Sequence, residues 1–455
     1  MTDWNAAEDH VDRALEFFKR GRLEEAEKSL RLALEIAPDR GDWLFNLALT
    51  LDASGRLNEA IDFYLDAVAA LPQEGEILAA AGVALAKANR SEEALAHLDK
   101  ACTLAPDCEE AWAQQIDVLA SLDRHEDAEK AYYLAQQYLE EYPNCLFAMG
   151  ESLFARKELD RAAWCFREAA SQDPSLPRVR ARLGAVLAES GRTHRAVRMF
   201  IQDLREDPGS TQTLMEFGDL LNKLGRYGEA EEKYRRVLEL QPADIEAHLR
   251  LAQLSMRLGR HEQAVAELEL VRSLAPDDES MILHLAAALL ALKKKRKARR
   301  LLVEHAELLI KVSDRDEIAR LCDLLLAAGL PGIATDILEN SIVGAPNDIG
   351  LLRRLAYARF DGGDNRGGDR VSRRLVRLDP GLTSSHENLV LSALESNRPG
   401  LARMRLNRAL SRCPGDERLR RLRVLLVVRL IPTLWRGLSS RFTRKGRTGP
   451  TPNSG

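Results

Sequence analysis

The residues that could carry chemistry are sparse, and the most suggestive group is a loop rich in Asp and Gly. Residues 361–369 read Asp-Gly-Gly-Asp-Asn-Arg-Gly-Gly-Asp, and carboxylates among glycines are typical of calcium loops. A calcium loop places its oxygen ligands at alternate positions and closes with a distal glutamate, and this segment does neither. We therefore interpret it as a frayed turn or hinge, in which Gly367 and Gly368 weaken the start of a helix.

The motifs of the common catalytic sites are absent. The chain has no G-x-x-x-x-G-K-[ST] phosphate loop, no H-E-x-x-H zinc motif and no G-x-S-x-G nucleophile turn. Its nine histidines are scattered. Its six cysteines form no C-x-x-C pair and are expected to be small buried side chains in a reducing compartment. We therefore expect no metal, no cofactor and no enzymatic activity.

One basic run lies at residues 293–300, which read Lys-Lys-Lys-Arg-Lys-Ala-Arg-Arg. Such a run could bind a nucleic acid or an anionic lipid, or serve as a nuclear-import signal. It has no interleaved aromatic side chains that would stack on bases, so we interpret it as a solvated turn.

The elements that must position all these residues come from a repeat of 34 residues. Alanine recurs at this spacing, and in most units a proline follows twelve residues later. The alanine column consists of Ala26, Ala60, Ala94, Ala128, Ala162, Ala196, Ala230, Ala264 and Ala298, and it continues at Ala334 and Ala402. Self-similarity at such a period is typical of stacked repeat units, which offer a long surface rather than a pocket.

Each unit is predicted to contain two helices. In residues 211–244, Leu214 and Phe217 are spaced for one face of a first helix, which Gly225 ends in a left-handed conformation. A second helix carries Ala230 and stops at Pro242. Ala230 is small because the two helices cross closely there, and neither helix can bury its apolar face without a neighbouring unit.

These residues resemble the tetratricopeptide repeat family. Residues 177–210 match its pattern through Leu183, Gly184, Leu187, Ala196, Phe200 and Pro208. The resemblance implies an all-α fold, a right-handed α-solenoid of about twelve helix-turn-helix units with a C-terminal capping helix. It also implies protein binding, although a fold does not name a partner.

The register divides the chain into six segments. They are an N-terminal lead-in at 1–6, units 1–9 at 7–312, a two-residue slip at 313–314, units 10–12 at 315–416, an amphipathic capping helix at 417–435 and a basic disordered tail at 436–455. The slip and the glycines at 367–368 predict a weak point between residues 279 and 382.

Charge is distributed unevenly along the array. Residues 1–278 carry 33 Lys and Arg against 52 Asp and Glu, whereas residues 279–416 carry 23 against 17 and residues 417–455 carry 10 against 1. An acidic array with a basic end would repel nucleic acid over most of its length, so nucleic-acid binding is disfavoured. The alternative is drift among solvated residues without function.

The resemblance implies that the first helix of each unit lines a concave groove. Its inward positions predict acidic and aromatic side chains in the early units, and Arg and apolar side chains in the later ones. The predicted groove residues are Glu76, Glu110, Asp117, Phe147, Glu151, Phe154, Met215, Arg250, Met256, Arg257, Arg354 and Tyr357. Phe and Met would anchor a basic or apolar-basic peptide, unless they pack against the neighbouring helix.

The C-terminal helix has two opposed apolar stripes. Leu419, Leu422, Leu426 and Leu430 form the stripe expected to cap the array, whereas the second stripe consists of Val424, Val428, Ile431 and Trp435. The second stripe, flanked by arginines, suits a partner helix or an anionic membrane surface. Alternatively, it packs back on the array or dimerises.

These patterns predict a non-enzymatic scaffold or adaptor that binds peptide or helical segments of other proteins. The alternative is a peripheral-membrane assembly factor anchored by its basic amphipathic C-terminal helix. The first residues, Met-Thr-Asp-Trp, do not read as a secretion signal, and we expect a cytoplasmic protein, or alternatively a peripheral membrane protein.

Overall fold

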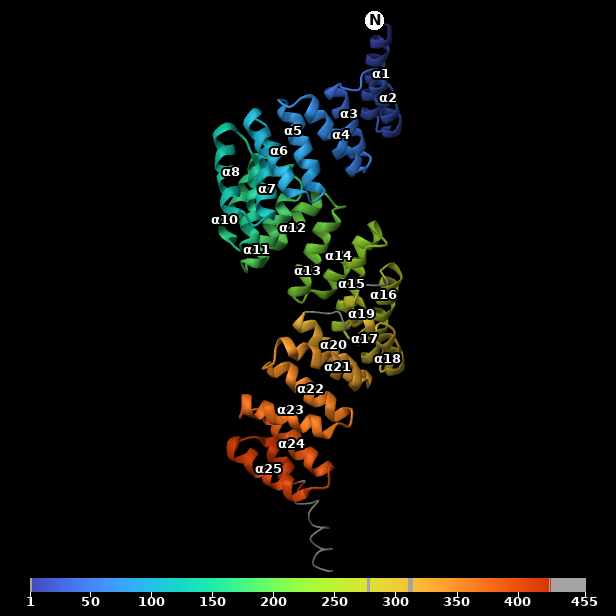
Figure 1. Cartoon of the computed structure of the whole chain (residues 1–455). Coiled ribbons are helices and arrows are strands. Elements are labelled where there is room, and N and C mark those ends of the chain that lie inside the picture. Colours follow the sequence, from blue (N-terminus) through green and yellow to red (C-terminus); the bar gives the residue numbers. More distant parts are fainter. Residues whose placement is uncertain (1, 276–278, 310–313, 425, 427–455) are drawn as a thin grey trace, which may run out of the picture. The chain divides into compact units, whose positions relative to one another are not determined.

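The computed structural model describes residues 2–275, 279–309, 314–424 and 426, which form α-helices joined by short turns (Figure 1). No strand occurs within these ranges. Most helices come in consecutive pairs, a first and a second helix, and they confirm the predicted all-α solenoid class. The chain divides into two compact units, residues 1–240 (unit 1) and 241–455 (unit 2), which we describe separately.

Unit 1 contains the first fourteen helices. In chain order they are α1 (Thr2–Lys19), α2 (Leu23–Ile36), α3 (Gly41–Ala53), α4 (Leu57–Ala70), α5 (Gly75–Lys87), α6 (Ser91–Leu104), α7 (Glu109–Ser121), α8 (His125–Tyr138), α9 (Pro143–Ala155), α10 (Leu159–Gln172), α11 (Val179–Glu189), α12 (Thr193–Glu206), α13 (Thr211–Lys223) and α14 (Tyr227–Leu240). Because α1 already begins at Thr2, residues 2–6 of the expected lead-in belong to the first helix.

Unit 2 continues with eleven helices up to Arg412 within its described residues. They are α15 (Ile245–Arg257), α16 (His261–Leu274), α17 (Glu279–Ala291), α18 (Lys295–Glu304), α19 (Ala306–Leu309), α20 (Arg315–Ala328), α21 (Pro331–Gly344), α22 (Ile349–Asp361), α23 (Asn365–Leu378), α24 (Thr383–Glu395) and α25 (Pro399–Arg412). Residues 417–424 are also helical.

The crossings between paired helices depend on small residues. Ala230 is completely buried, as are the other members of the alanine column. On the partner helix, a Cβ at Gly218 would lie 2.5 Å from the Tyr234 ring, so α13 and α14 approach too closely for any side chain there. The predicted close crossing is confirmed.

The turns between paired helices use left-handed residues. Gly225 has a φ of 76°, as predicted, and the Arg226 backbone N–H donates to the Leu221 carbonyl. Several units place a side chain at this position, including Asn89 and Lys293, with φ values of 59°.

The interpretation of residues 361–369 as a frayed turn is wrong. Helix α23 begins at Asn365, and the Asp364 carboxylate accepts a hydrogen bond of 2.9 Å from the Gly367 backbone N–H. A Cβ at Gly368 would lie 2.6 Å from the Phe360 ring. Glycine therefore replaces alanine at this crossing because Phe360 already fills it, and the helix start is capped rather than frayed.

The basic run is also more helical than expected. Only Lys293 and Lys294 lie in the turn, and α18 begins at Lys295. The register slip ends at Asp314, whose carboxylate accepts from the backbone N–H groups of Asp316 and Glu317 at 3.0 Å each and so caps α20. Ser313, the other residue of the slip, lies outside the described ranges.

The helix at residues 417–424 packs on the last pair. Leu419, Leu422 and Leu426 are buried in one cluster with residues of α24 and α25, among them Val390 and Leu406. They cover the apolar face that α24 and α25 would otherwise expose. Leu430 and the tail at 436–455 lie outside the described residues.

Candidate peptide-binding surface

The first helices of consecutive pairs in unit 1 are joined by polar side chains. Lys87 of α5 pairs with Asp52 of α3 at 3.0 Å, and Arg182 of α11 pairs with Glu151 of α9. These contacts place residues of neighbouring first helices on one shared surface. We call it the first-helix surface, formed by Asp52, Glu76, Glu110, Asp117, Phe147, Glu151, Phe154, Arg178, Arg182, Met215 and Glu216.

Its N-terminal part carries uncompensated carboxylates. Glu76 of α5 and Glu110 of α7 hold the same position in units 34 residues apart, and both are exposed, as is Asp117. Their carboxylates have no ion-pair or hydrogen-bond partner among the described residues. The surrounding protein and the charge of Glu151 raise the pKa of Asp117 above its ordinary value. On the first-helix surface, these uncompensated carboxylates therefore lie on α5 and α7.

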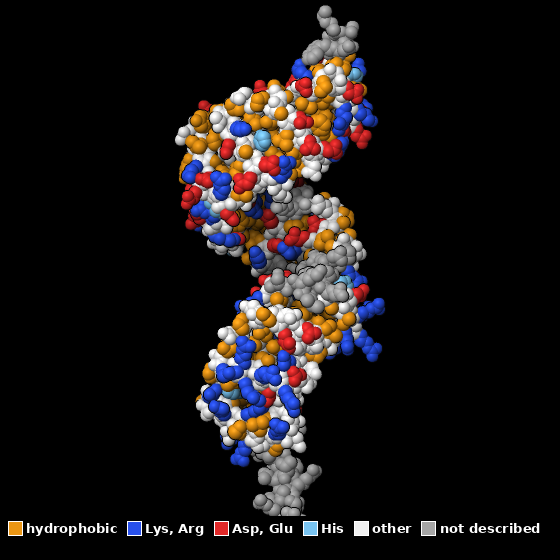
Figure 2. Space-filling model, in the orientation of Figure 1, with side chains coloured by type: hydrophobic (Ala, Val, Ile, Leu, Met, Phe, Trp, Pro, Cys, Tyr) orange, Lys and Arg blue, Asp and Glu red, His pale blue; other side chains and the backbone are white. Residues whose placement is uncertain are grey.

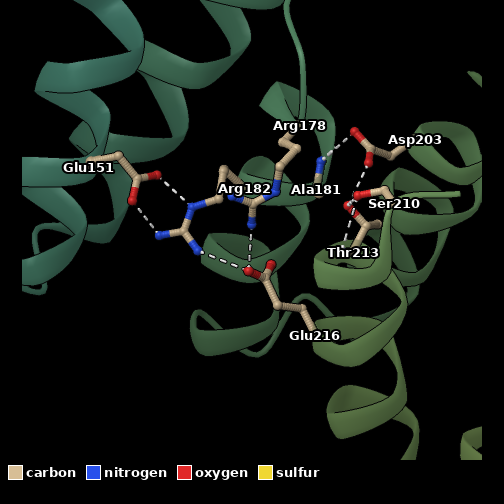
Figure 3. Close-up of polar contacts among 8 residues, drawn as sticks. All are labelled: Glu151, Arg178, Ala181, Arg182, Asp203, Ser210, Thr213 and Glu216. Atoms are coloured by element: carbon tan, nitrogen blue, oxygen red, sulfur yellow. Dashed lines mark hydrogen bonds and ion pairs between the residues drawn. The ribbon is translucent and has the colours of Figure 1, made fainter. Parts of the chain in front are cut away.

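The next part of the surface is a cluster of ion pairs on α9, α11 and α13 (Figure 3). The Arg182 guanidinium donates from Nε and Nη2 to the two carboxylate oxygens of Glu151, at 2.5 Å each. Its Nη1 lies 3.5 Å from Glu216 Oε1, which also accepts from Arg178 Nη2 at 2.7 Å. Two arginines thus hold two carboxylates from the helices on either side of α11.

This cluster corrects the expectation that Glu151 adds to the acidic field. Its charge is compensated by the bidentate pair with Arg182. The aromatic residues beside it are also engaged: Arg182 lies over the Phe154 ring at 5.1 Å, and Phe147 makes an edge contact with Phe166 at 5.5 Å between centroids. Both phenylalanines are half-buried, so each leaves only part of its ring for a ligand.

The side chains of this cluster are only partly shielded from bulk water, and burial acts on the pKa of Glu216 and of Arg182 in opposite directions. Burial, together with the charges of Glu151 and Asp203, raises the pKa of Glu216 although Arg178 and Arg182 act to lower it. Burial alone would lower the pKa of Arg182, but its bonds to Glu151 raise it. Glu216 Oε2 and Arg178 Nε are buried without a hydrogen-bond partner in the described structure. Arg178 also has a φ of 62°, a strained left-handed conformation for this residue type.

A buried aspartate holds the helices that carry this cluster. Asp203 of α12 accepts from the Ala181 backbone N–H at 3.1 Å and from the Thr213 hydroxyl at 2.9 Å. Ser210 donates to Thr213 at 2.9 Å (Figure 3). Asp203 and Glu216 were not among the residues predicted from the sequence. Glu216 occupies an inward position of its unit, so the repeat register could have identified it. Asp203 lies on a second helix, where the register predicts no groove residue.

In unit 2 the predicted groove residues are mostly paired or packed. Arg354 makes two bonds of 2.9 Å to Asp323, and Arg250 pairs with Glu246 at 2.8 Å. Met256 is half-buried against the core of the unit. The side chain of Tyr357 remains 57% exposed, and Arg257 is also exposed. These residues do not form a continuous charged surface like that of α5 and α7.

The second stripe of the C-terminal helix is represented by one described residue. Val424 is 64% exposed, on a helix whose leucines face the core. Val428, Ile431 and Trp435 lie outside the described residues.

Reactive groups are few in the described part of the chain. No cluster of three potential metal ligands occurs there, and all six cysteines are free. Cys102, Cys145, Cys165 and Cys322 are buried as expected, whereas Cys108 and Cys413 are half-buried. Burial raises the pKa of the Cys165 thiol to about 11, which disfavours its reactive thiolate form. None of the described helices is both long and apolar enough to cross a bilayer.

Two segments match tetratricopeptide repeat family models, residues 11–75 and residues 221–289. No curated protein sequence matches the chain. Similar solved structures include pilF of Pseudomonas aeruginosa (21% identity over 46% of this chain and 94% of that one, TM-score 0.39). Others are a tetratricopeptide repeat protein from Parabacteroides merdae ATCC 43184 (17%, covering 63% and 99%, TM-score 0.41) and yeast Tom70 (14%, covering 97% and 99%, TM-score 0.35). The two family matches, together with the paired helices that have alanine and glycine at their crossings, show that residues 11–75 and 221–289 are tetratricopeptide repeats.

Proposed function

We propose that this protein is a non-enzymatic interaction scaffold whose first-helix surface in unit 1 binds partner segments with basic and apolar side chains. The observation that carries the proposal is the uncompensated set Glu76, Glu110 and Asp117 on α5 and α7. Repeat proteins of this kind offer extended surfaces, and the family matches support the scaffold role.

The neighbouring residues support the choice of ligand. Carboxylates attract and orient Lys and Arg side chains of a peptide, which sets specificity and association rate. The half-buried rings of Phe147 and Phe154 offer apolar contact next to this acidic region. The compensated pair of Glu151 and Arg182 marks the boundary beyond which the surface no longer favours cations.

The test is charge reversal with a matched control. Glu110→Lys with Asp117→Lys should weaken binding of a labelled Lys- and Leu-containing peptide about tenfold or more at low salt, and raised salt should reduce the difference. The control is Glu92→Lys with Glu126→Lys, which makes the same charge change at exposed positions of the second helices α6 and α8. Equal loss in both variants would show diffuse attraction and reject the surface.

A second candidate function rests on the exposed Val424, which follows Arg423 on the helix whose leucines cap the array. In this alternative the C-terminal segment binds an anionic membrane surface. Val428→Ser with Trp435→Ser should release the protein from vesicles containing phosphatidylserine while leaving Leu419 and Leu422 to cap the array. Wild-type protein that does not sediment with such vesicles at low salt would remove this alternative.

A further inference from the structure

Helices α23, α24 and α25 of unit 2 enclose a groove of about 1030 Å³. Residues of α23 and α25 form its walls and residues of α24 its floor. Figure 2 shows Lys and Arg side chains gathered over this part of the molecule. We call it the arginine groove, because seven of its lining residues are arginines and one is acidic: Arg366, Arg373, Arg377, Arg398, Arg405, Arg408, Arg412 and Asp369.

Helical spacing brings these arginines together. On α23, Arg373 and Arg377 are four residues apart, and on α25, Arg408 and Arg412 are four residues apart, so each pair lies on one helix face. The groove therefore has a positively charged wall on each side.

The single carboxylate joins the two walls. Asp369 of α23 accepts from Arg405 Nη2 of α25 at 2.7 Å and from Arg373 Nη2 at 3.3 Å. Arg405 also donates to the Leu389 carbonyl at 2.5 Å. Burial would raise the pKa of Asp369, but Arg405, Ser392 and Arg373 together lower it. This contact is structural, and it compensates only part of the positive charge.

The remaining arginines are uncompensated. Arg366, Arg377, Arg398, Arg408 and Arg412 are exposed and have no carboxylate partner among the described residues. Like charges around one groove repel one another and are stabilised by a bound anion. All the cations are arginines, whose planar guanidinium groups bind carboxylates in bidentate geometry.

The groove is also partly apolar, which narrows the class of ligand. Leu389 and Ala393 lie on its floor, and Met404, at its edge, is 61% exposed. No Phe, Tyr or Trp side chain lines it, and the imidazole of His386, which does, is buried with Nε2 bonded to the Pro380 carbonyl at 3.0 Å. The groove therefore lacks the exposed rings on which single-stranded nucleic acids stack. Phosphate groups would satisfy the arginines but not the apolar residues, whereas a peptide with acidic and apolar side chains satisfies both.

We propose that the arginine groove is a second protein-binding site, which takes an acidic, leucine-containing segment of a partner protein. The groove favours a negatively charged ligand, whereas the first-helix surface of unit 1 favours a positively charged one. All residues of the groove belong to unit 2. The chain would then hold two partners of opposite charge at separate sites.

The test uses the full chain and a fluorescein-labelled peptide of alternating Glu and Leu, followed by fluorescence anisotropy. Arg377→Glu with Arg408→Glu should weaken binding about tenfold or more. The matched control, Arg370→Glu with Arg403→Glu, makes the same charge change at exposed positions of α23 and α25 outside the groove, and should change affinity by less than about twofold. Circular dichroism checks that both variants keep their helix content, and Gln substitutions at the same positions replace any variant that does not.

Four results would overturn the proposal. These are no binding by the wild type, equal loss in both variants, equal binding of the peptide in which Ser replaces Leu, and tighter binding of polyphosphate or single-stranded RNA than of the peptide. The Glu110→Lys and Asp117→Lys variant of unit 1 should bind the acidic peptide as the wild type does, so failure of this proposal and failure of the unit 1 surface can be told apart.

Discussion

At the crossings of paired helices, adding a single methyl group should change the stability of the protein. Gly218 faces Tyr234 in the crossing of α13 and α14, whereas Gly228, on α14 itself, has no atom within 4 Å of the place where its Cβ would be. The same chemical change at these two glycines therefore meets opposite environments.

Gly218→Ala should destabilise the protein by about 1–3 kcal/mol, because its Cβ would overlap the Tyr234 ring. Gly228→Ala should instead stabilise it by about 0.5–1 kcal/mol, because alanine restricts the unfolded chain and favours the helix. Urea unfolding of both variants beside the wild type measures the difference. Equal effects of the two changes would contradict the crossing geometry.

Asp117 should make the stability of the folded protein depend on pH. Burial and the charge of Glu151 raise its pKa above the ordinary value of an aspartate, so its ionised form is disfavoured in the folded protein. The stability that protonation provides is therefore present at low pH and is lost as the pH rises through the raised pKa. Asp117→Asn should be at least as stable as the wild type at neutral pH, as thermal unfolding would show.

The same residue should couple peptide binding to pH. Wild-type affinity for a Lys- and Leu-containing peptide should fall as the pH drops through the raised pKa of Asp117, because the carboxylate loses its charge. Asp117→Asn should bind more weakly at neutral pH and lack this step. A titration curve of the same shape for both proteins would exclude Asp117 from the surface.

At the scale of elements, the repeat register predicted helix starts closely. The unit starts expected at 41, 75, 211 and 245 are the first residues of α3, α5, α13 and α15. Two first helices depart from the register. Helix α1 begins at Thr2 instead of 7, and α11 begins at Val179 instead of 177, after Pro177 and the left-handed Arg178. Periodicity carries this information because every unit repeats the same crossing and turn.

Contacts that break the repeat could not be predicted in this way. The pairing of Glu151 with Arg182 depends on side-chain conformations of adjacent units, and from the sequence Glu151 was expected to be an uncompensated groove carboxylate. The arginine groove combines residues of two second helices and one first helix, and its arginines do not share one register position. The fit of Gly368 against Phe360 likewise needs the packed helices.

The helix at 417–424 should control the stability of the last pair. Leu422→Ala should destabilise α24 and α25 by about 2–5 kcal/mol, because it removes a buried side chain from their outer face. Hydrogen exchange resolved by mass spectrometry should accelerate in residues 383–412. Arg423→Ala, at an exposed neighbouring position, is the control and should leave exchange there unchanged.

At the scale of the whole molecule, the two units should respond independently to such changes. Stability in repeat arrays depends on each pair and its nearest neighbours. Gly218→Ala should therefore accelerate hydrogen exchange in unit 1 and not in α22–α25, whereas Leu422→Ala should do the reverse. Acceleration of both units by either change would show one cooperative unit and contradict this expectation.

The ion pair between Arg178 and Glu216 joins residues only 38 positions apart, and the other bridges described here span still shorter stretches. Chains with such local contacts lose little loop entropy before their contacts form. A ribosome releases residues in order, so each pair of helices can meet its predecessor soon after it leaves the exit tunnel. The N-terminal acidic surface would then be complete, and able to engage a partner, while the arginine groove is still being synthesised.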